Sequence, residues 1–481
     1  MRLLALLAVV VLAVTGCSGS DSARPGVLSV GLREPETLLP ADLADQAGRL
    51  VTGALWTPLA DYDAASGKVT PRAAASIEST DRVHWTVKLR PATFHDGTPV
   101  TAQSYVDTWR AVAAARWVST PVLTNLLRAR EITAPAPDTI ALTLDRPSGQ
   151  VPALLSAPGL VPLPASVLAS RDWDGFAKAP VGNGPYRLDG GWHPGSGGTL
   201  KRVGAGKAEE IELRVGEPAA QYDAVKAGTL DLATEVPGAQ HDAMHGDFAD
   251  RHATWALPEA GYLAFPVPDP RFADATVRHG FALGVDRAAL EAGPLAHQVD
   301  PAKALLPPAD APGERTGTCR PCSFDAAAGK ALLKQAAFPG GATVYFGPGA
   351  ETWTRTLVVG LHKALDVSVT AQALPNTGRL DGPSTVDVKL ATASPYELLS
   401  ELAARSGYQD PVFRQNLDLA DAAATPEEAG ELYRLAENQL LRDLPVAPLW
   451  SGHGHSVWGP RVHDVTTTPF TGPVLAGIGV S

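Results

Sequence analysis

Hydrophobic and polar residues alternate regularly from His84 to Arg90, with Trp85, Val87 and Leu89 at every second position. This period of two is typical of a strand that buries one face and exposes the other. We therefore predict a half-buried strand over this segment.

A turn and a helix are predicted directly after this strand. The segment 94–97 is Phe-His-Asp-Gly, and its Asp-Gly pair is suited to a tight turn. Thr101 can then cap a helix in which Tyr105, Trp109 and Val112 lie three and four residues apart, the spacing of one helical face.

Similar patterns predict further elements along the chain. Alternating or apolar runs predict strands at 27–32, 140–144, 211–215, 230–232 and 343–346. Helical spacing predicts helices at 221–227, from 274 with Asp274 as cap, at 323–337 with Ser323 as cap, and after Thr425.

The last of these helices has the clearest boundaries. Thr425 as cap, Pro426 at the first helical position and Glu428 three residues after the cap form a capping box. The positions that repeat at helical spacing are Leu432, Leu435 and Gln439-Leu440, and Pro445 is expected to end the helix.

The N-terminus has the layout of a secretory signal. Arg2 precedes an uncharged apolar run from Leu3 to Val14, which is too short to span a bilayer comfortably. The small residues before Cys17 resemble a lipoprotein processing site, so we expect residues 1–16 to be removed and Cys17 to carry lipid. The alternative is an ordinary signal with an incidental cysteine. Residues 17–26, rich in Ser and Gly, are predicted to be a lipidated tether.

Composition excludes some partners. The formal net charge is -11 with acidic and basic residues interspersed, so no basic patch is available to bind nucleic acid. The remaining chain is long enough for two or three domains, and no second apolar run is long enough to span a bilayer.

Apart from Cys17, the cysteines are the pair Cys319 and Cys322. A Cys-x-x-Cys pair can be a redox centre, half of a zinc site or a local disulfide. Export favours the disulfide, and no second cysteine pair exists to complete a zinc site.

Five segments together resemble family 5 of the extracellular solute-binding proteins, the peptide- and nickel-type receptors of ATP-driven (ABC) importers. They are the strand with its Phe-x-Asp-Gly turn, followed by 181–187, 222–231, 277–287 and 436–448. The resemblance implies an α/β, two-lobed periplasmic-binding-protein-like fold (type II, cluster C) with a third, smaller domain and a hinge between the lobes. It implies lobe I from 27–49, 181–261 and 446–481, the small domain from 50–180, and lobe II from 262–445.

Histidines provide a weak sign of metal binding. His241 and His245 lie one helical turn apart with His252 beyond, a spacing that zinc or nickel can use. A solvated polar helix face explains the same pattern, and His453-Gly-His455 is a similarly weak candidate. We expect no metal site, no cofactor and no catalytic residue, because neither a phosphate loop nor a nucleophile elbow is present.

The family resemblance also bears on the ligand. Peptide receptors of this family typically hold the peptide amino terminus with an Asp in a Trp-rich stretch of the second lobe. The corresponding segment here, 390–397, contains neither Trp nor Asp, so the anchor looks absent unless Glu397 replaces it. Unmodified di- to pentapeptides are therefore expected to bind weakly, and a modified peptide, a sugar-like molecule or another polar solute is favoured.

The ligand contacts implied by the resemblance come from both lobes. They are Glu36, Leu38, Trp56, Tyr262, Ser394, Tyr396, Glu397 and Trp450. For the tryptophans, an ordinary core position is the alternative.

The sequence thus predicts a lipid-anchored extracytoplasmic receptor, not an enzyme, that acts as a monomer and delivers a solute to an ABC permease. A rival hypothesis is an envelope lipoprotein with the same fold that serves as a regulatory or interaction partner. A receptor for a metal chelate is a third, weaker possibility.

Overall fold

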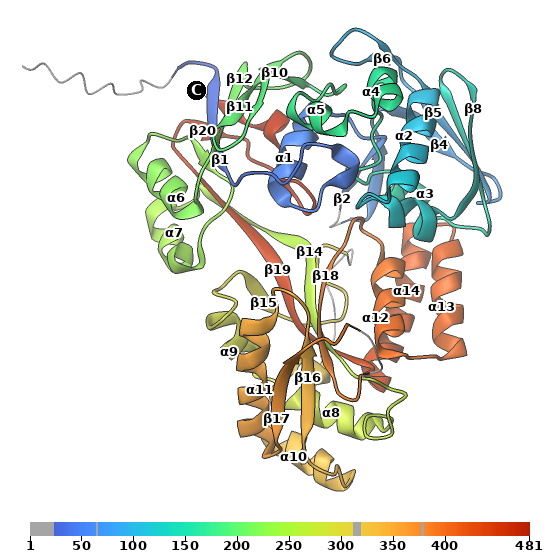
Figure 1. Ribbon diagram of the computed structural model, residues 1–481, viewed down its shortest axis with the longest axis vertical. Helices are drawn as coiled ribbons and strands as arrows, with labels where there is room; N and C mark the ends of the chain where they lie inside the picture. Colours follow the sequence, from blue (N-terminus) through green and yellow to red (C-terminus); the bar gives the residue numbers. More distant parts are fainter. Residues whose placement is uncertain (1–23, 64–65, 311–318, 377–379) are drawn as a thin grey trace, which may run out of the picture.

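The computed structural model describes residues 24–63, 66–310, 319–376 and 380–481. Figure 1 shows a wide upper body and a narrower lower body, joined by the long strands β14 (His252–Ala264) and β19 (Val446–Trp458). Each has 13 residues, and at roughly 3.3 Å per residue they are about 40 Å long. These two crossing strands reach both bodies, as expected for a two-lobed α/β fold.

One 11-stranded sheet continues from the upper body into the lower one. Its order is β10 (Tyr186–His193), β11 (Gly197–Arg202), β12 (Glu210–Val215), β1 (Val27–Leu32), β13 (Leu232–Ala233), β19, β14, β18 (Ser384–Lys389), β16 (Ala342–Phe346) and β17 (Val369–Ala373), with β15 (Val299–Pro301) beside β19. β1 is parallel to both neighbours, with Val30 opposite Leu213 and Leu232. A strand enclosed in this way is nearly continuously apolar.

The small domain has its own antiparallel sheet. Its order is β4 (Ala74–Glu78), β5 (His84–Leu89), β9 (Thr139–Leu144) and β8 (Ala129–Ala136). Trp85, Val87 and Leu89 are buried, as their alternation predicted. Helix α2 (Ala102–Ala115) covers this sheet, and Thr101 and Ser104 form the capping box that fixes its start.

Lobe II places helices on both sides of the crossing strands (Figure 1). One group consists of α8 (Ala275–Leu283), α9 (Arg287–Ala292), α10 (Ala326–Gln335) and α11 (Glu351–Leu365), and the other of α12 (Pro395–Ser406), α13 (Pro411–Ala422) and α14 (Pro426–Asp443). Successive residues of β14 serve opposite cores, since Leu263 packs with the first group and Tyr262 with the second. The crossing strands therefore form the middle layer of lobe II.

The main core of the upper body is shared by lobe I and the small domain. Val30 of β1 and Trp109 of α2 belong to the same buried cluster, while Tyr222 and Phe248 of lobe I belong to a separate, smaller one. The longer helices in the rest of the upper body are α1 (Gln46–Leu55), α6 (Pro218–Ala227) and α7 (His241–Phe248). The boundaries at residues 49/50 and 180/181 stay a prediction.

Shorter elements complete the described chain. They are β2 (Ala60–Asp63), β3 (Lys68–Pro71), β6 (Ala92–Thr93), β7 (Pro99–Val100), α3 (Val151–Leu154), α4 (Ala165–Ser170), α5 (Trp173–Lys178), β20 (Val462–His463), β21 (Thr467–Thr468), β22 (Gly472–Pro473), β23 (Gly479–Val480), and the turns η1 (Pro40–Asp42), η2 (Val122–Leu127), η3 (Gly238–Gln240), η4 (Arg320–Cys322) and η5 (Leu475–Gly477).

Most predicted helix ends and strands are confirmed. α6 ends at Gly228, whose φ of +76° is the left-handed conformation of a helix cap. Asp274 caps α8 and Thr425 caps α14. In α14 the Glu428 carboxylate accepts from the Ala424 N–H (3.0 Å), one residue before the cap.

Three local predictions are wrong. The strand predicted at 230–232 begins only at Leu232, because the Asp231 carboxylate instead accepts two hydrogen bonds from Ser29 (both 2.9 Å). α10 is capped by Asp325 and not by Ser323, since Asp325 accepts from the Ala328 N–H (2.9 Å).

The third concerns α14. Leu435 lies on its solvent face with 54% of its surface exposed. The buried face instead contains Tyr433, Ala436 and Leu440.

Candidate solute site

A cavity of about 1120 Å³ lies between the small domain and lobe II. β3, α3 and the segment around β4 and β5 form its upper wall, and α14 with residues 303–310 forms its lower wall. The crossing strands connect these walls, so a hinge motion would change the width of the cavity.

Buried polar groups line this cavity but form no hydrogen bonds with one another. Within the described residues, the indole N–H of Trp85, both carboxyl oxygens of Asp310 and the hydroxyl of Tyr433 have no hydrogen-bond partner. These side chains are 7%, 1% and 3% exposed. A buried polar group without a partner costs about 1–3 kcal/mol, so each group can be satisfied by a polar ligand.

Asp310 is close to a second buried acid, Glu397. Burial, together with the charge of Glu397, raises the pKa of Asp310 well above its usual range. Burial also raises the pKa of Glu397 to about 7, with repulsion from Glu401 adding to it and a hydrogen bond from the Thr392 hydroxyl (3.1 Å) opposing it. Asp310 is therefore a cavity-lining carboxyl group that a nearby positive charge would ionise, with the second carboxyl group of Glu397 close to it.

An ionic contact holds the small domain against lobe II beside the cavity. Arg128 pairs with Asp421 of α13, and the Asp421 carboxylate also accepts from the Ser148 hydroxyl (3.0 Å). Arg146 lies 3.4 Å from Asp421 and pairs with Asp418. We call this set of residues the interdomain clasp.

Tyr396 lies at the centre of the interdomain clasp. The guanidinium groups of Arg128 and Arg146 lie 5.0 and 5.1 Å from the centre of its ring. Cation–π contacts of this kind add to the ionic pairs. The structure therefore shows the small domain in direct contact with lobe II.

The eight residues predicted to contact ligand are not among the described residues that line the cavity. Glu36 is exposed in the loop after β1. Leu38, Trp56, Tyr262 and Trp450 are buried in cores, at 2%, 2%, 1% and 9% exposure.

Two of these aromatic residues have partners within the protein. The Trp56 indole N–H donates to the Pro162 carbonyl (3.0 Å), and the Tyr262 hydroxyl donates to the Leu305 carbonyl (2.6 Å). These contacts favour the alternative, that both are core residues.

The remaining three predicted residues begin α12. Ser394 caps this helix, accepting from the Glu397 N–H (3.4 Å). Tyr396 belongs to the interdomain clasp, and Glu397 lies behind Asp310. Ala393 and Pro395, on either side of Ser394, do line the cavity.

Sequence reasoning missed Asp310, Tyr433 and the interdomain clasp. The one available signal was an acidic residue within the apolar run 302–312. The local sequence patterns around Tyr433 and Arg128 indicate only a helix and a loop. The contacts of these residues with distant segments could therefore not be predicted.

The predicted disulfide is present, since Cys319 and Cys322 are joined. Next to it, Arg287 donates to the Pro321 carbonyl (2.8 Å). The signal peptide, Cys17 and most of the predicted tether lie outside the described residues. Within the described part of the chain, no helix has both the length and the apolar character needed to cross a membrane.

The histidines meet in a different arrangement from the predicted one. His241 lies near His453 and His455 of β19, whereas His245 contacts His252 at 3.3 Å between ring nitrogens. None of these rings lines the cavity described above.

Two lobes, two crossing strands and a cavity with buried polar groups between the small domain and lobe II are the features expected of a solute-binding receptor. The family model described as "Bacterial extracellular solute-binding proteins, family 5 Middle" matches residues 68–414. The chain belongs to this family, whose members are binding receptors and not enzymes.

Solved structures show the same fold. HbpA2 from Haemophilus parasuis is similar with a TM-score of 0.80 and 16% identity over 95% of this chain and 100% of that one. The murein tripeptide binding protein MppA of Escherichia coli gives 0.73 and 20% over 95% and 99%. AgaA from A. tumefaciens R10, solved with agropinic acid, gives 0.75 and 22% over 95% and 99%. A comparison with curated protein sequences found no match.

Proposed function

We propose that this protein is a lipid-anchored receptor that captures a solute carrying a positively charged group, such as the amino terminus of a short peptide, and delivers it to an ABC permease. The observation that carries the proposal is the Asp310 carboxyl, which lines the cavity, is 1% exposed and has no hydrogen-bond partner among the described residues.

A cationic group fits this site for electrostatic reasons. A buried carboxylate is stable only when it is paired or hydrogen-bonded, and otherwise it takes up a proton. An ammonium group beside Asp310 would restore the charged form and make a charge-assisted hydrogen bond. Glu397 behind Asp310 would strengthen this attraction.

The rest of the cavity suits a polar ligand with several bonding groups. The Tyr433 hydroxyl and the Trp85 N–H can each bond a ligand oxygen, and the Trp85 indole offers a flat apolar surface. The volume of about 1120 Å³ slightly exceeds the roughly 300–1,000 Å³ of small-molecule sites. A ligand of several linked units is therefore favoured.

This proposal departs from the expectation that unmodified short peptides bind weakly. That expectation depended on the missing Asp in segment 390–397, and it left open a substitute at Glu397. Asp310 with Glu397 supplies such a substitute from a different segment of lobe II. MppA and AgaA are named for or solved with a murein tripeptide and agropinic acid, which supports a polar, peptide-like ligand class.

Binding would act by shifting an equilibrium between open and closed forms. A ligand held by both walls of the cavity has higher affinity for the closed form, in which the interdomain clasp is made. Lipid on Cys17 would keep the receptor at the membrane surface, where the permease could receive the solute.

The test begins with native mass spectrometry of freshly purified protein to find a bound molecule. Calorimetry then compares short peptides with free and acetylated amino termini on the wild type, Asp310→Asn and the control Glu431→Gln, an exposed residue of α14. We expect free amines to bind and Asp310→Asn to weaken binding about 100-fold, since losing one partner of a buried charge pair costs about 2–5 kcal/mol.

Equal binding of acetylated peptides, or an unchanged affinity in Asp310→Asn, would overturn the proposed anchor. Absence of any bound solute together with stable association with cell-wall proteins would favour the rival interaction role.

A further inference from the structure

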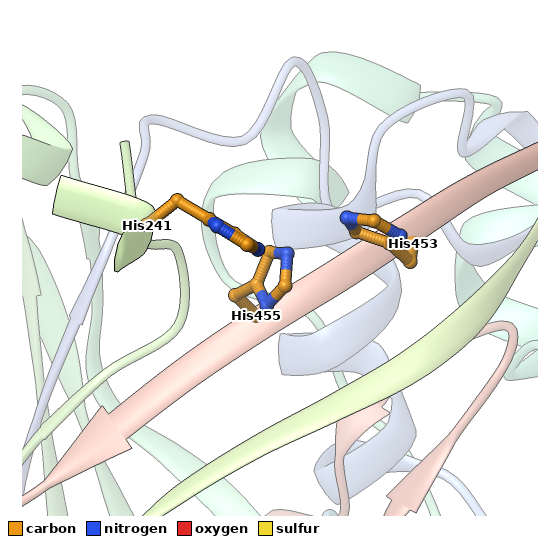
Figure 2. Close-up of side chains that lie close together, drawn as sticks. All are labelled: His241, His453 and His455. Carbon is orange, nitrogen blue, oxygen red and sulfur yellow. The ribbon is translucent and has the colours of Figure 1, made fainter. Parts of the chain in front are cut away.

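Three histidines from distant parts of the chain point toward one another behind the crossing strands. His241 is the first residue of α7, and His453 and His455 lie two residues apart on the same face of β19. One ring nitrogen from each lies within 4.8 Å of those of the other two. Figure 2 shows the three rings gathered between the start of α7 and the strand.

His455 is the most deeply buried of the three. Its side chain is 3% exposed, and its Nδ1 is 3.1 Å from the Thr254 hydroxyl. Its Nε2 has no hydrogen-bond partner among the described residues. With Nδ1–H donating to Thr254, Nε2 presents an unshared lone pair, which is the form of histidine that binds metals.

The three imidazole rings pack directly against one another. The ring of His455 is 4.5 Å from that of His453 and 4.9 Å from that of His241, measured between centroids. A buried imidazole that is packed against two others is poorly explained as a solvated surface group.

His453 has a carboxylate partner of the kind found at metal sites. Its Nδ1 lies 3.1 Å from the Asp300 carboxylate, and its Nε2 lies 3.0 Å from the His297 carbonyl. A metal would replace the second of these bonds, while the first would orient the ring. A metal-bound histidine usually donates its other N–H to a carboxylate or carbonyl.

We propose that His241, His453 and His455 bind one divalent transition-metal ion of the zinc class, with a fourth position left for water. Neutral imidazoles suit zinc, nickel and copper. In a tetrahedral zinc site with bonds of about 2.0–2.1 Å, ligand nitrogens are about 3.4 Å apart, so the ring nitrogens need to approach by up to about 1.4 Å. His241, which is 22% exposed at the end of its helix, has room to make that movement.

The position of this site gives it a structural meaning. His241 belongs to lobe I, β19 crosses between the lobes, and Asp300 lies on β15 of lobe II. A metal bound there would join α7 to the crossing strand on a part of the hinge that does not line the solute cavity. The site is independent of the proposed solute, so failure of one proposal leaves the other intact.

The test uses full-length protein without a histidine tag and with its bound metal first removed by a chelator. Zn²⁺ alone is titrated by calorimetry into the wild type, His455→Gln, His241→Gln, Asp300→Asn and the control His362→Gln, an exposed histidine of α11. We expect one Zn²⁺ per chain with a Kd below about 1 μM. Either ligand variant should lose more than about 100-fold, and Asp300→Asn about 10- to 100-fold, because it keeps all three ligands.

Co²⁺ gives a second readout that does not depend on affinity. Four-coordinate Co²⁺ in the wild type should show strong visible absorption that disappears in His455→Gln, while circular dichroism confirms that the variant is folded. Zinc binding no tighter in the wild type than in His455→Gln and His241→Gln would overturn the site, as would absorption typical of six-coordinate Co²⁺.

Discussion

Replacing Glu397 with Gln should make the unliganded protein less sensitive to alkaline pH. The pKa of Glu397 is about 7 in the folded protein, against an ordinary value of 4.5, mainly because the side chain is buried. The folded state therefore holds this proton more tightly than the unfolded state does. Stability falls as the pH rises from about 4.5 through 7, and the loss is complete above that range.

The size of this effect follows from the two pKa values. The difference between 4.5 and about 7 corresponds to roughly 3 kcal/mol, at about 1.4 kcal/mol for each tenfold change in affinity for the proton. Gln cannot ionise and can still accept the hydrogen bond from Thr392. The variant should thus be more stable than the wild type by up to roughly 3 kcal/mol at pH 8.5, with little difference at pH 4.5.

The protein is first unfolded and refolded to remove any bound solute. Urea unfolding at 25 °C, at pH 4.5 and 8.5, then measures the free energy of unfolding of the variant and the wild type. Glu431→Gln is the matched control, because Glu431 is exposed on α14. It should follow the wild type at both pH values. If the wild type and Glu397→Gln lost the same free energy of unfolding between the two pH values, the assigned pKa of Glu397 would be refuted.

Three further predictions test other parts of the molecule. Asp421→Asn leaves both arginines of the interdomain clasp without their buried carboxylate, at a cost of about 3–5 kcal/mol. Small-angle scattering of unliganded protein should then show a larger radius of gyration, and an unchanged radius would count against the clasp. Gly261→Ala places a Cβ 2.1 Å from the Trp450 ring and should lower the free energy of unfolding by about 1–3 kcal/mol; wild-type stability would contradict this packing. Cys17→Ala should release the protein from washed membranes, whereas full retention would remove the lipid anchor.

Local structure could be predicted wherever one strong pattern acted alone. The alternation of β5 and the caps of α2 and α14 depend on neighbours within a few residues, so the sequence specifies them directly. β14 was not predicted as a strand, and its register shifts between Ala256 and Ala260, around Pro258. A bulge of this kind interrupts the period of two that a strand prediction needs.

The candidate sites could not be predicted in the same way, because their residues come from distant segments. Asp310 and Tyr433 line the same wall of the cavity, and His241 of α7 lies close to His455 of β19. The predicted pairing of His241 with His245 followed helical spacing correctly, and their ring centroids lie 6.1 Å apart. Tertiary packing nevertheless gives His241 a nearer partner on β19, since the ring centroid of His455 lies 4.9 Å from that of His241.

Two buried carboxyl groups of this protein differ in their hydrogen-bond and ion-pair partners, and the difference indicates function. Asp421 is 3% exposed, and it is paired with Arg128 and bonded by Ser148, as expected where a carboxylate only holds two domains together. Asp310 is about as deeply buried, yet no described residue forms a hydrogen bond with its carboxyl group. The charge of a second acid, Glu397, further raises the free-energy cost of ionising Asp310. A Leu at position 310 would avoid that cost in the unliganded protein. Departures from favourable local chemistry are expected at functional sites. A positively charged ligand group would offset this cost, and the energy released when it pairs with Asp310 would favour the closed form.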